Sequence, residues 1–110
     1  MPKTYDAAAL IEELELDQED IVELLTDFRA FLVETLPQLQ SAITSEDLES
    51  SRSLSHSLKG SAGNLRVNAV YETAKKMQDV ADQSDTAQLK VLWIQLKNNC
   101  DEFMVESENI

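Results

Sequence analysis

Glycine, proline and cysteine are scarce in this chain of 110 residues, which has two glycines, two prolines and one cysteine. An all-β fold needs turn residues about every 8–12 positions, so this scarcity favours helices. The single cysteine, Cys100, excludes an internal disulfide framework and suggests a reducing compartment. Because Cys100 falls on an apolar helical stripe, we expect a core residue rather than a reactive thiol.

Basic residues are also a minority, with nine lysines and arginines against 21 acidic residues and a net charge of −12. This charge disfavours nucleic acid and anionic membranes as partners. No apolar run approaches the ~18 residues that span a bilayer, and the N-terminus, MPKTYDAAAL, has no signal-peptide pattern. We therefore expect a cytoplasmic protein, and the apolar helical stripes described next favour a monomer. We expect no metal site, because His56 and Cys100 lie on different predicted helices and the carboxylates lack ligand spacing.

Apolar residues recur at steps of three and four along most of the chain. The pattern predicts long helices over about residues 18–43, 46–65, 67–83 and 85–107, and a short leading helix over about 6–13. The expected N-cap residues are Asp17, then Thr44 or Ser45, and then Ser84 or Asp85. Short connections favour antiparallel neighbours. The sequence therefore predicts an all-α fold, a single domain over residues 1–110, in which an up-and-down antiparallel four-helix bundle carries a short extra N-terminal helix.

His56, the only histidine, lies on the second long helix. At about 100° per residue, with Leu58 at the centre of the apolar stripe, Leu54 and Leu65 fall within about 40° of that centre. His56 then lies about 160° away, on the solvent face. An exposed imidazole that is neutral near pH 7 is a competent nucleophile.

Both glycines of the chain, Gly60 and Gly63, fall inside this same helix. Each costs about 1 kcal/mol relative to alanine. The helical angles place both on the face of His56, so we interpret them as clearance for the imidazole and for a partner surface. The alternative is close packing against another helix, and near the following turn a backbone requirement could also select Gly63.

Positive charge is concentrated around the histidine. Residues 52–76 contain five basic residues and one acidic residue, a net charge of +4 within a protein of −12. The basic residues are Arg52, Lys59, Arg66, Lys75 and Lys76. Lys59 lies one turn from His56, where an ammonium can neutralise part of a phosphoryl group's charge. Lys75 and Lys76 fit an ordinary solvated face equally well.

The string from His56 to Leu65, HSLKGSAGNL, closely resembles the signature of histidine phosphotransfer (HPt) domains, H-x-L-K-G-S-[SA]-x-x-[LI]-G. By this resemblance His56 is the phosphorylated histidine, Lys59 stabilises the phosphoryl group and Gly60 gives clearance. The resemblance implies a phosphorelay carrier rather than an enzyme, without a cofactor of its own. Its expected partner is the receiver domain of a response regulator or hybrid histidine kinase, which contributes an aspartate and Mg²⁺. We expect Arg52, Gly63 and Arg66 to help dock that partner.

The chain departs from the HPt pattern at two positions. Arg66 replaces a glycine, which leaves the geometry of the following turn open, and Gln78 replaces a glutamate of the next helix. We expect neither departure to touch the phosphoryl chemistry. The helix pair of a sensor kinase is disfavoured, because Ser57 rather than an acidic residue follows the histidine. The phosphotransfer domain of a chemotaxis-type histidine kinase and a non-catalytic acidic helical adaptor remain alternatives.

Overall fold

The regular structure is helical throughout the part of the chain that the computed structural model describes, which is Tyr5 and residues 7–108. Five helices follow one another: α1 (Ala7–Leu14), α2 (Gln18–Thr44), α3 (Leu48–Asn64), α4 (Asn68–Asp82) and α5 (Thr86–Glu106). The long helices begin and end within about two residues of the predicted positions, the margin within which helix ends are defined. The short leading helix is present as well, although its expected start, Asp6, lies outside the described residues.

Aspartate side chains cap the N-termini of three long helices. Asp17, Asp47 and Asp85 each accept a hydrogen bond from the backbone N–H three residues later, at 2.9, 3.1 and 3.0 Å. These bonds satisfy backbone donors that have no partner within the helix. The expected cap of α3 at Thr44 or Ser45 is wrong, because α2 continues through Thr44 and Ser45 closes its C-terminal end.

The three connections between long helices share one geometry. Glu46, Arg66 and Ser84 adopt the left-handed conformation, with φ of 58°, 58° and 57°. In each connection the next residue donates its backbone N–H to the carbonyl five positions earlier, at 2.8, 2.9 and 2.9 Å, which is a Schellman motif. That next residue is also the N-cap of the following helix. The turn between α3 and α4 is therefore a Schellman turn, in which Arg66 adopts the left-handed conformation that glycine usually provides.

Residues from all five helices and from the N-terminal segment form one core. The fully buried large side chains include Leu10, Ile21, Leu25, Leu32, Leu39, Leu58, Met77, Leu96 and Phe103. On α3 the buried residues are Ser51, Ser55, Leu58 and Ala62, whereas Leu54 is only partly buried. The buried face of α3 is thus turned slightly from the predicted centre, toward Ser55, and His56 stays on the exposed side.

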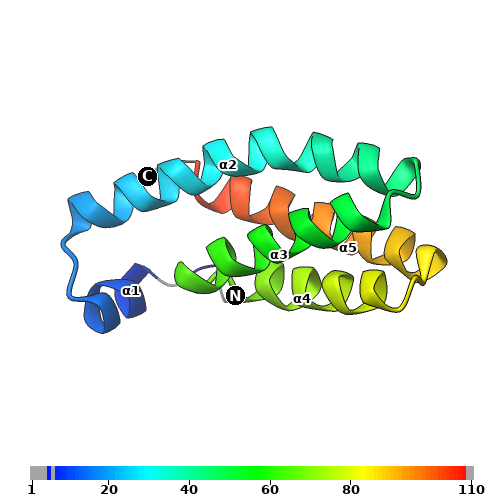
Figure 1. The fold of residues 1–110 in the computed structure, drawn as a ribbon. Helices are drawn as coiled ribbons and strands as arrows, with labels where there is room; N and C mark the ends of the chain where they lie inside the picture. The colour runs from blue at the N-terminus through cyan, green and yellow to red at the C-terminus, as the bar shows by residue number, and fades with distance from the viewer. Residues whose placement is uncertain (1–4, 6, 109–110) are drawn as a thin grey trace.

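The four long helices lie side by side along the molecule, and α1 lies at one end (Figure 1). α3 packs against α2 and α4, and α5 packs against α4 and α2, so the contacts form a closed ring. The ring of Tyr5 meets that of Phe103 edge-on at 5.5 Å, which ties the N-terminal segment to the end of the core. Among the described helices, none combines the length and the apolar character needed to cross a bilayer.

Candidate functional site

The imidazole of His56 is exposed on α3 and meets one side chain of α4. Its Nδ1 is 3.4 Å from Oε1 of Gln78, a long contact. An amide oxygen only accepts hydrogen bonds, so this contact favours the tautomer with hydrogen on Nδ1. Nε2 then carries the lone pair, and it has no partner among the residues described. Among the described residues the ring therefore has a side-chain contact at Nδ1 and an open nitrogen at Nε2.

Gln78 is the site residue that the sequence analysis missed. It was noted only as a departure from the HPt pattern and was expected to lie outside the phosphoryl chemistry. The structure places the Gln78 amide against the imidazole itself. The expectation that this departure leaves the phosphoryl chemistry unchanged stays a prediction. Helical periodicity could not reveal this contact, since it relates residues of one helix and Gln78 lies on another.

Two of the cations predicted near His56 are engaged within the chain. The Arg52 guanidinium forms an ion pair with Asp82 of α4. Arg66 donates to Glu13 of α1 at 2.9 Å and to the carbonyl of Gly63 at 2.8 Å. Side chains in both ion pairs are about half exposed, so each pair contributes at most about 1 kcal/mol and can rearrange when a partner binds. Docking roles for Arg52 and Arg66 stay predictions.

Lys59 differs from these arginines. It follows His56 by one helical turn and is partly buried. Within the described part of the chain no carboxylate lies within ion-pair distance of its ammonium. An unpaired ammonium one turn from the imidazole is suited to hold an anion there.

The two glycines of α3 have different surroundings. A Cβ added at Gly60 would meet nothing within 4 Å, so this side of His56 is open as predicted. A Cβ at Gly63 would lie 3.1 and 3.3 Å from Cδ1 and Cε1 of Tyr71 on α4. The expectation that Gly63 faces open solvent is therefore wrong, because it allows the Tyr71 ring to pack closely against α3. Of the two glycines, only Gly60 leaves open space beside His56 for a partner surface.

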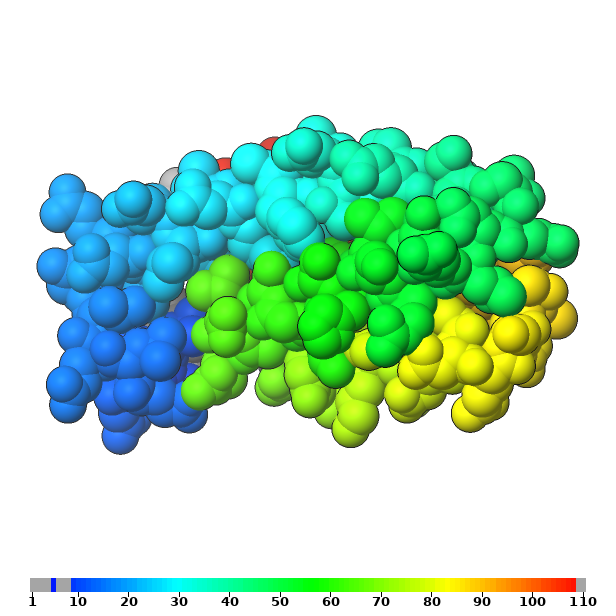
Figure 2. Space-filling view, viewed as in Figure 1, coloured from blue at the N-terminus to red at the C-terminus, as the bar shows by residue number. Residues whose placement is uncertain are grey.

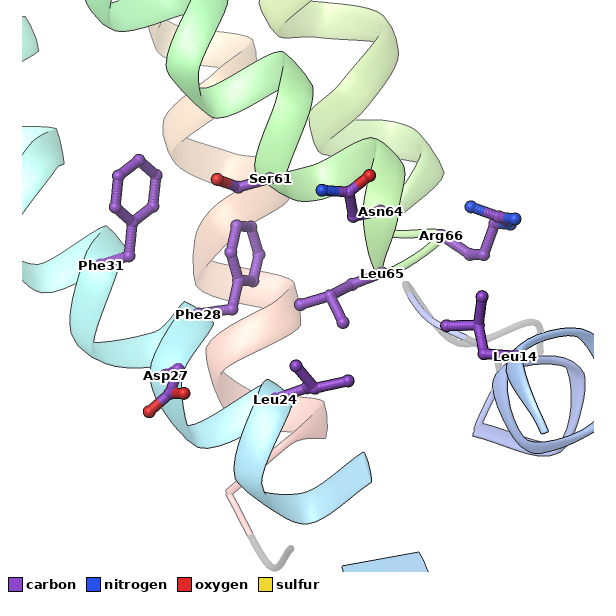
Figure 3. A pocket seen from close by; sticks show the side chains of 9 residues that line it. All are labelled: Leu14, Leu24, Asp27, Phe28, Phe31, Ser61, Asn64, Leu65 and Arg66. Atoms are coloured by element: carbon purple, nitrogen blue, oxygen red, sulfur yellow. The ribbon is translucent and has the colours of Figure 1, made fainter. Parts of the chain in front are cut away.

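A groove of about 520 Å³ lies where α1, the first half of α2 and the C-terminal end of α3 meet. Figure 2 shows this hollow in the surface beside α1. Leu24, Phe28, Phe31 and Leu65 give it an apolar wall, and Arg66 lies at its edge (Figure 3). The groove reaches α3 at Ser61, which directly follows Gly60. Ser61 comes five residues after His56, about 140° around the helix, so the groove lies on the flank of α3 that faces α2, beside the exposed face that carries His56.

Comparison with known proteins shows the family to which this chain belongs. The model of the Hpt domain family matches residues 23–104, which include all of α3 and α4. The chain belongs to the Hpt domain family. No curated protein and no solved structure matches it. Hpt domains carry out histidine phosphotransfer in phosphorelay signalling and are phosphocarrier modules rather than catalysts.

Other reactive groups of this Hpt domain are few. Cys100 is fully buried, as expected of a core residue, and burial, followed by the charge of Asp101, raises the pKa of its thiol to about 12. A thiol that keeps its proton and is shielded from solvent is a poor nucleophile. In the portion of the chain that is described, no cluster of three or more histidine, cysteine or acidic residues could hold a metal ion.

Proposed function

We propose that this Hpt domain is a phosphorelay intermediate that carries a phosphoryl group on Nε2 of His56 and exchanges it with the aspartate of a receiver domain. The observation that supports this proposal most strongly is the exposed imidazole whose Nδ1 faces Gln78 while Nε2 is free. We propose further that α2–α5 act as an up-and-down antiparallel four-helix bundle, a rigid support for this face.

The transfer needs no base on this chain. In the favoured tautomer, the lone pair of Nε2 attacks the phosphorus of the receiver's aspartyl phosphate. The N–P bond forms, the bond from phosphorus to the carboxylate oxygen breaks, and the aspartate leaves as a carboxylate. Nδ1 keeps its hydrogen toward Gln78 throughout. The reverse reaction returns the phosphoryl group to an aspartate.

The partner supplies the other groups of the reaction. The receiver holds the aspartate and Mg²⁺, so this chain needs no cofactor. Lys59, which has no carboxylate partner among the described residues, stabilises the phosphoryl group on His56. Gly60 lets the receiver surface approach the ring, because nothing lies within 4 Å of its missing Cβ.

The receiver docks across the outer face of α3. We infer that an apolar surface of the receiver covers the groove beside α1, while its active site lies over His56. Phe31 and Leu24 are partly buried and line this groove, so a partner can cover their remaining apolar surface. The chain acts as a monomer in the cytoplasm, where the single thiol of Cys100 stays reduced.

Phosphotransfer from a phosphorylated receiver tests the proposal. Acid-labile, base-stable phosphate should appear on the wild-type chain and be absent from a His56→Gln variant that melts at the same temperature. A Ser57→Ala variant, which changes the neighbouring exposed residue, should accept phosphate normally. Phosphate on His56→Gln would refute the assignment of His56. Receiver binding without any phosphate on the wild type would indicate the adaptor instead.

The contribution of Lys59 is tested by Lys59→Ala. Its transfer rate should fall by about threefold to tenfold, the effect of one partly desolvated charge-assisted contact, while the melting temperature changes little. Rapid-quench measurement of transfer from one phosphorylated receiver gives this rate. An unchanged rate would make Lys59 an ordinary surface residue.

A further inference from the structure

The facing flanks of α3 and α4 carry two rows of residues with identical spacing. Each row advances by four, three and four positions, which keeps its members on one side of a helix. The row on α3 is Arg52, His56, Lys59 and Gly63, and the row on α4 is Tyr71, Lys75, Gln78 and Asp82. The helices are antiparallel, so the first residue of one row faces the last of the other.

Three of the four facing pairs are in direct contact. Arg52 forms an ion pair with Asp82, and Nδ1 of His56 lies 3.4 Å from Oε1 of Gln78. At the other end, a Cβ on Gly63 would lie 3.1 Å from Tyr71. These contacts fix the register of the two helices at both ends of the rows and at His56.

The remaining facing pair is Lys59 and Lys75. The same register puts Lys75 opposite Lys59 and one turn from Gln78, whose amide contacts the imidazole of His56. Neither ammonium forms an ion pair with any residue that the structure describes. Two facing cations repel each other, and an anion between them removes that repulsion.

The other basic residues of the region do not share this position. Arg52 is paired with Asp82, and Arg66 is paired with Glu13. Lys76 is adjacent to Lys75 in sequence but falls on a different row of α4. That row includes Ala69 and Thr73, whose carbonyl and hydroxyl both accept hydrogen bonds from Asn99 of α5. Lys76 therefore lies toward α5 rather than α3.

We propose that Lys75 is a second phosphoryl-stabilising residue, which with Lys59 forms a two-cation site for the phosphoryl group on His56. This inference rests on the proposed function. A phosphoryl group carries about −1.5 to −2 charges near pH 7, so one ammonium leaves part of that charge without a partner. Lys75 supplies a second cation from the other helix.

The test compares Lys75→Ala with Lys76→Ala, which removes the same charge from the neighbouring exposed position of the same helix. The measured quantity is the equilibrium constant for phosphoryl exchange with one receiver. We expect Lys75→Ala to shift this equilibrium constant toward the phosphorylated receiver by about threefold to fivefold, and Lys76→Ala to shift it by less than about twofold. Lys75→Arg, which keeps the charge, should return the equilibrium constant to the wild-type value. Melting curves show whether each variant is folded.

A second readout is independent of the receiver. A nearby ammonium favours the dianion, so ³¹P NMR should show that Lys75→Ala raises the second pKa of the phosphoryl group on His56, whereas Lys76→Ala does not. Equal effects of the two substitutions in both measurements, or no effect of either, would overturn the role of Lys75. A wild-type chain that takes no phosphoryl group on His56 would instead overturn the proposed function.

Discussion

Replacing each glycine of α3 with alanine gives a sharp test of the packing between α3 and α4. Both glycines are helical with negative φ, so alanine should gain about 1 kcal/mol of helix propensity at either position. At Gly60 nothing opposes this gain, because the added Cβ meets no atom within 4 Å. We expect Gly60→Ala to raise the free energy of unfolding by about 1 kcal/mol and the melting temperature by about 4 °C.

At Gly63 the same substitution places a methyl group 3.1 Å from Cδ1 of Tyr71, closer than ordinary van der Waals contact. The Tyr71 ring must shift, and overpacking of this kind costs about 1–3 kcal/mol. The propensity gain should therefore be cancelled or exceeded. We expect Gly63→Ala to change the free energy of unfolding by between zero and a loss of about 2 kcal/mol.

A double-mutant cycle with Tyr71→Ala separates the two effects. In that background the clash is absent, so Gly63→Ala should regain its stabilisation of about 1 kcal/mol, with a coupling energy of about 1 kcal/mol or more. Gly60→Ala should be unaffected by Tyr71→Ala. Urea denaturation followed by circular dichroism at 222 nm measures each value. Equal gains at both glycines, or no coupling between Gly63 and Tyr71, would refute the packing described for these helices.

The remaining predictions concern the turns and the core. Ser84→Gly should stabilise the chain by about 0.5–1 kcal/mol in urea denaturation, because glycine adopts the left-handed conformation without strain, whereas Ser84→Ala should not. Leu58→Ala should cost about 2–5 kcal/mol, and more than Leu54→Ala, because Leu58 is fully buried and Leu54 only partly. Cys100 should react with a thiol reagent only as fast as the chain unfolds, and faster labelling of the native state would contradict its burial. The Cys100 thiol keeps its proton to about pH 12 in the folded chain but loses it near pH 9 in the unfolded chain. The folded state is therefore fully stable with respect to this group below about pH 9 and loses stability as the pH rises toward 12. Cys100→Ala should make the free energy of unfolding fall less steeply over this alkaline range.

Several features of this Hpt domain could be predicted from the sequence because they depend on a single helix. The apolar periodicity located the long helices, Asp17 was recognised as a cap from local chemistry, and Asp85 was one of the two candidates for the cap of α5. The exposed position of His56 followed from the angle between residues of α3, which is the same in every α-helix. The open side of Gly60 followed from that angle as well.

Features that involve two helices were decided only by the tertiary structure. Gly63 and Gly60 lie on the same broad face of α3, yet only Gly63 meets Tyr71, because the contact depends on how far α4 overlaps that face. The contact of Gln78 with His56 depends in the same way on the register of α3 against α4, and so does the position opposite Lys59 that we infer for Lys75. That register is set by side-chain packing and by the Schellman turn at Arg66. Periodicity along one helix carries no information about either, which is why the sequence predicted the exposed position of His56 but not the residues that face it from the neighbouring helix.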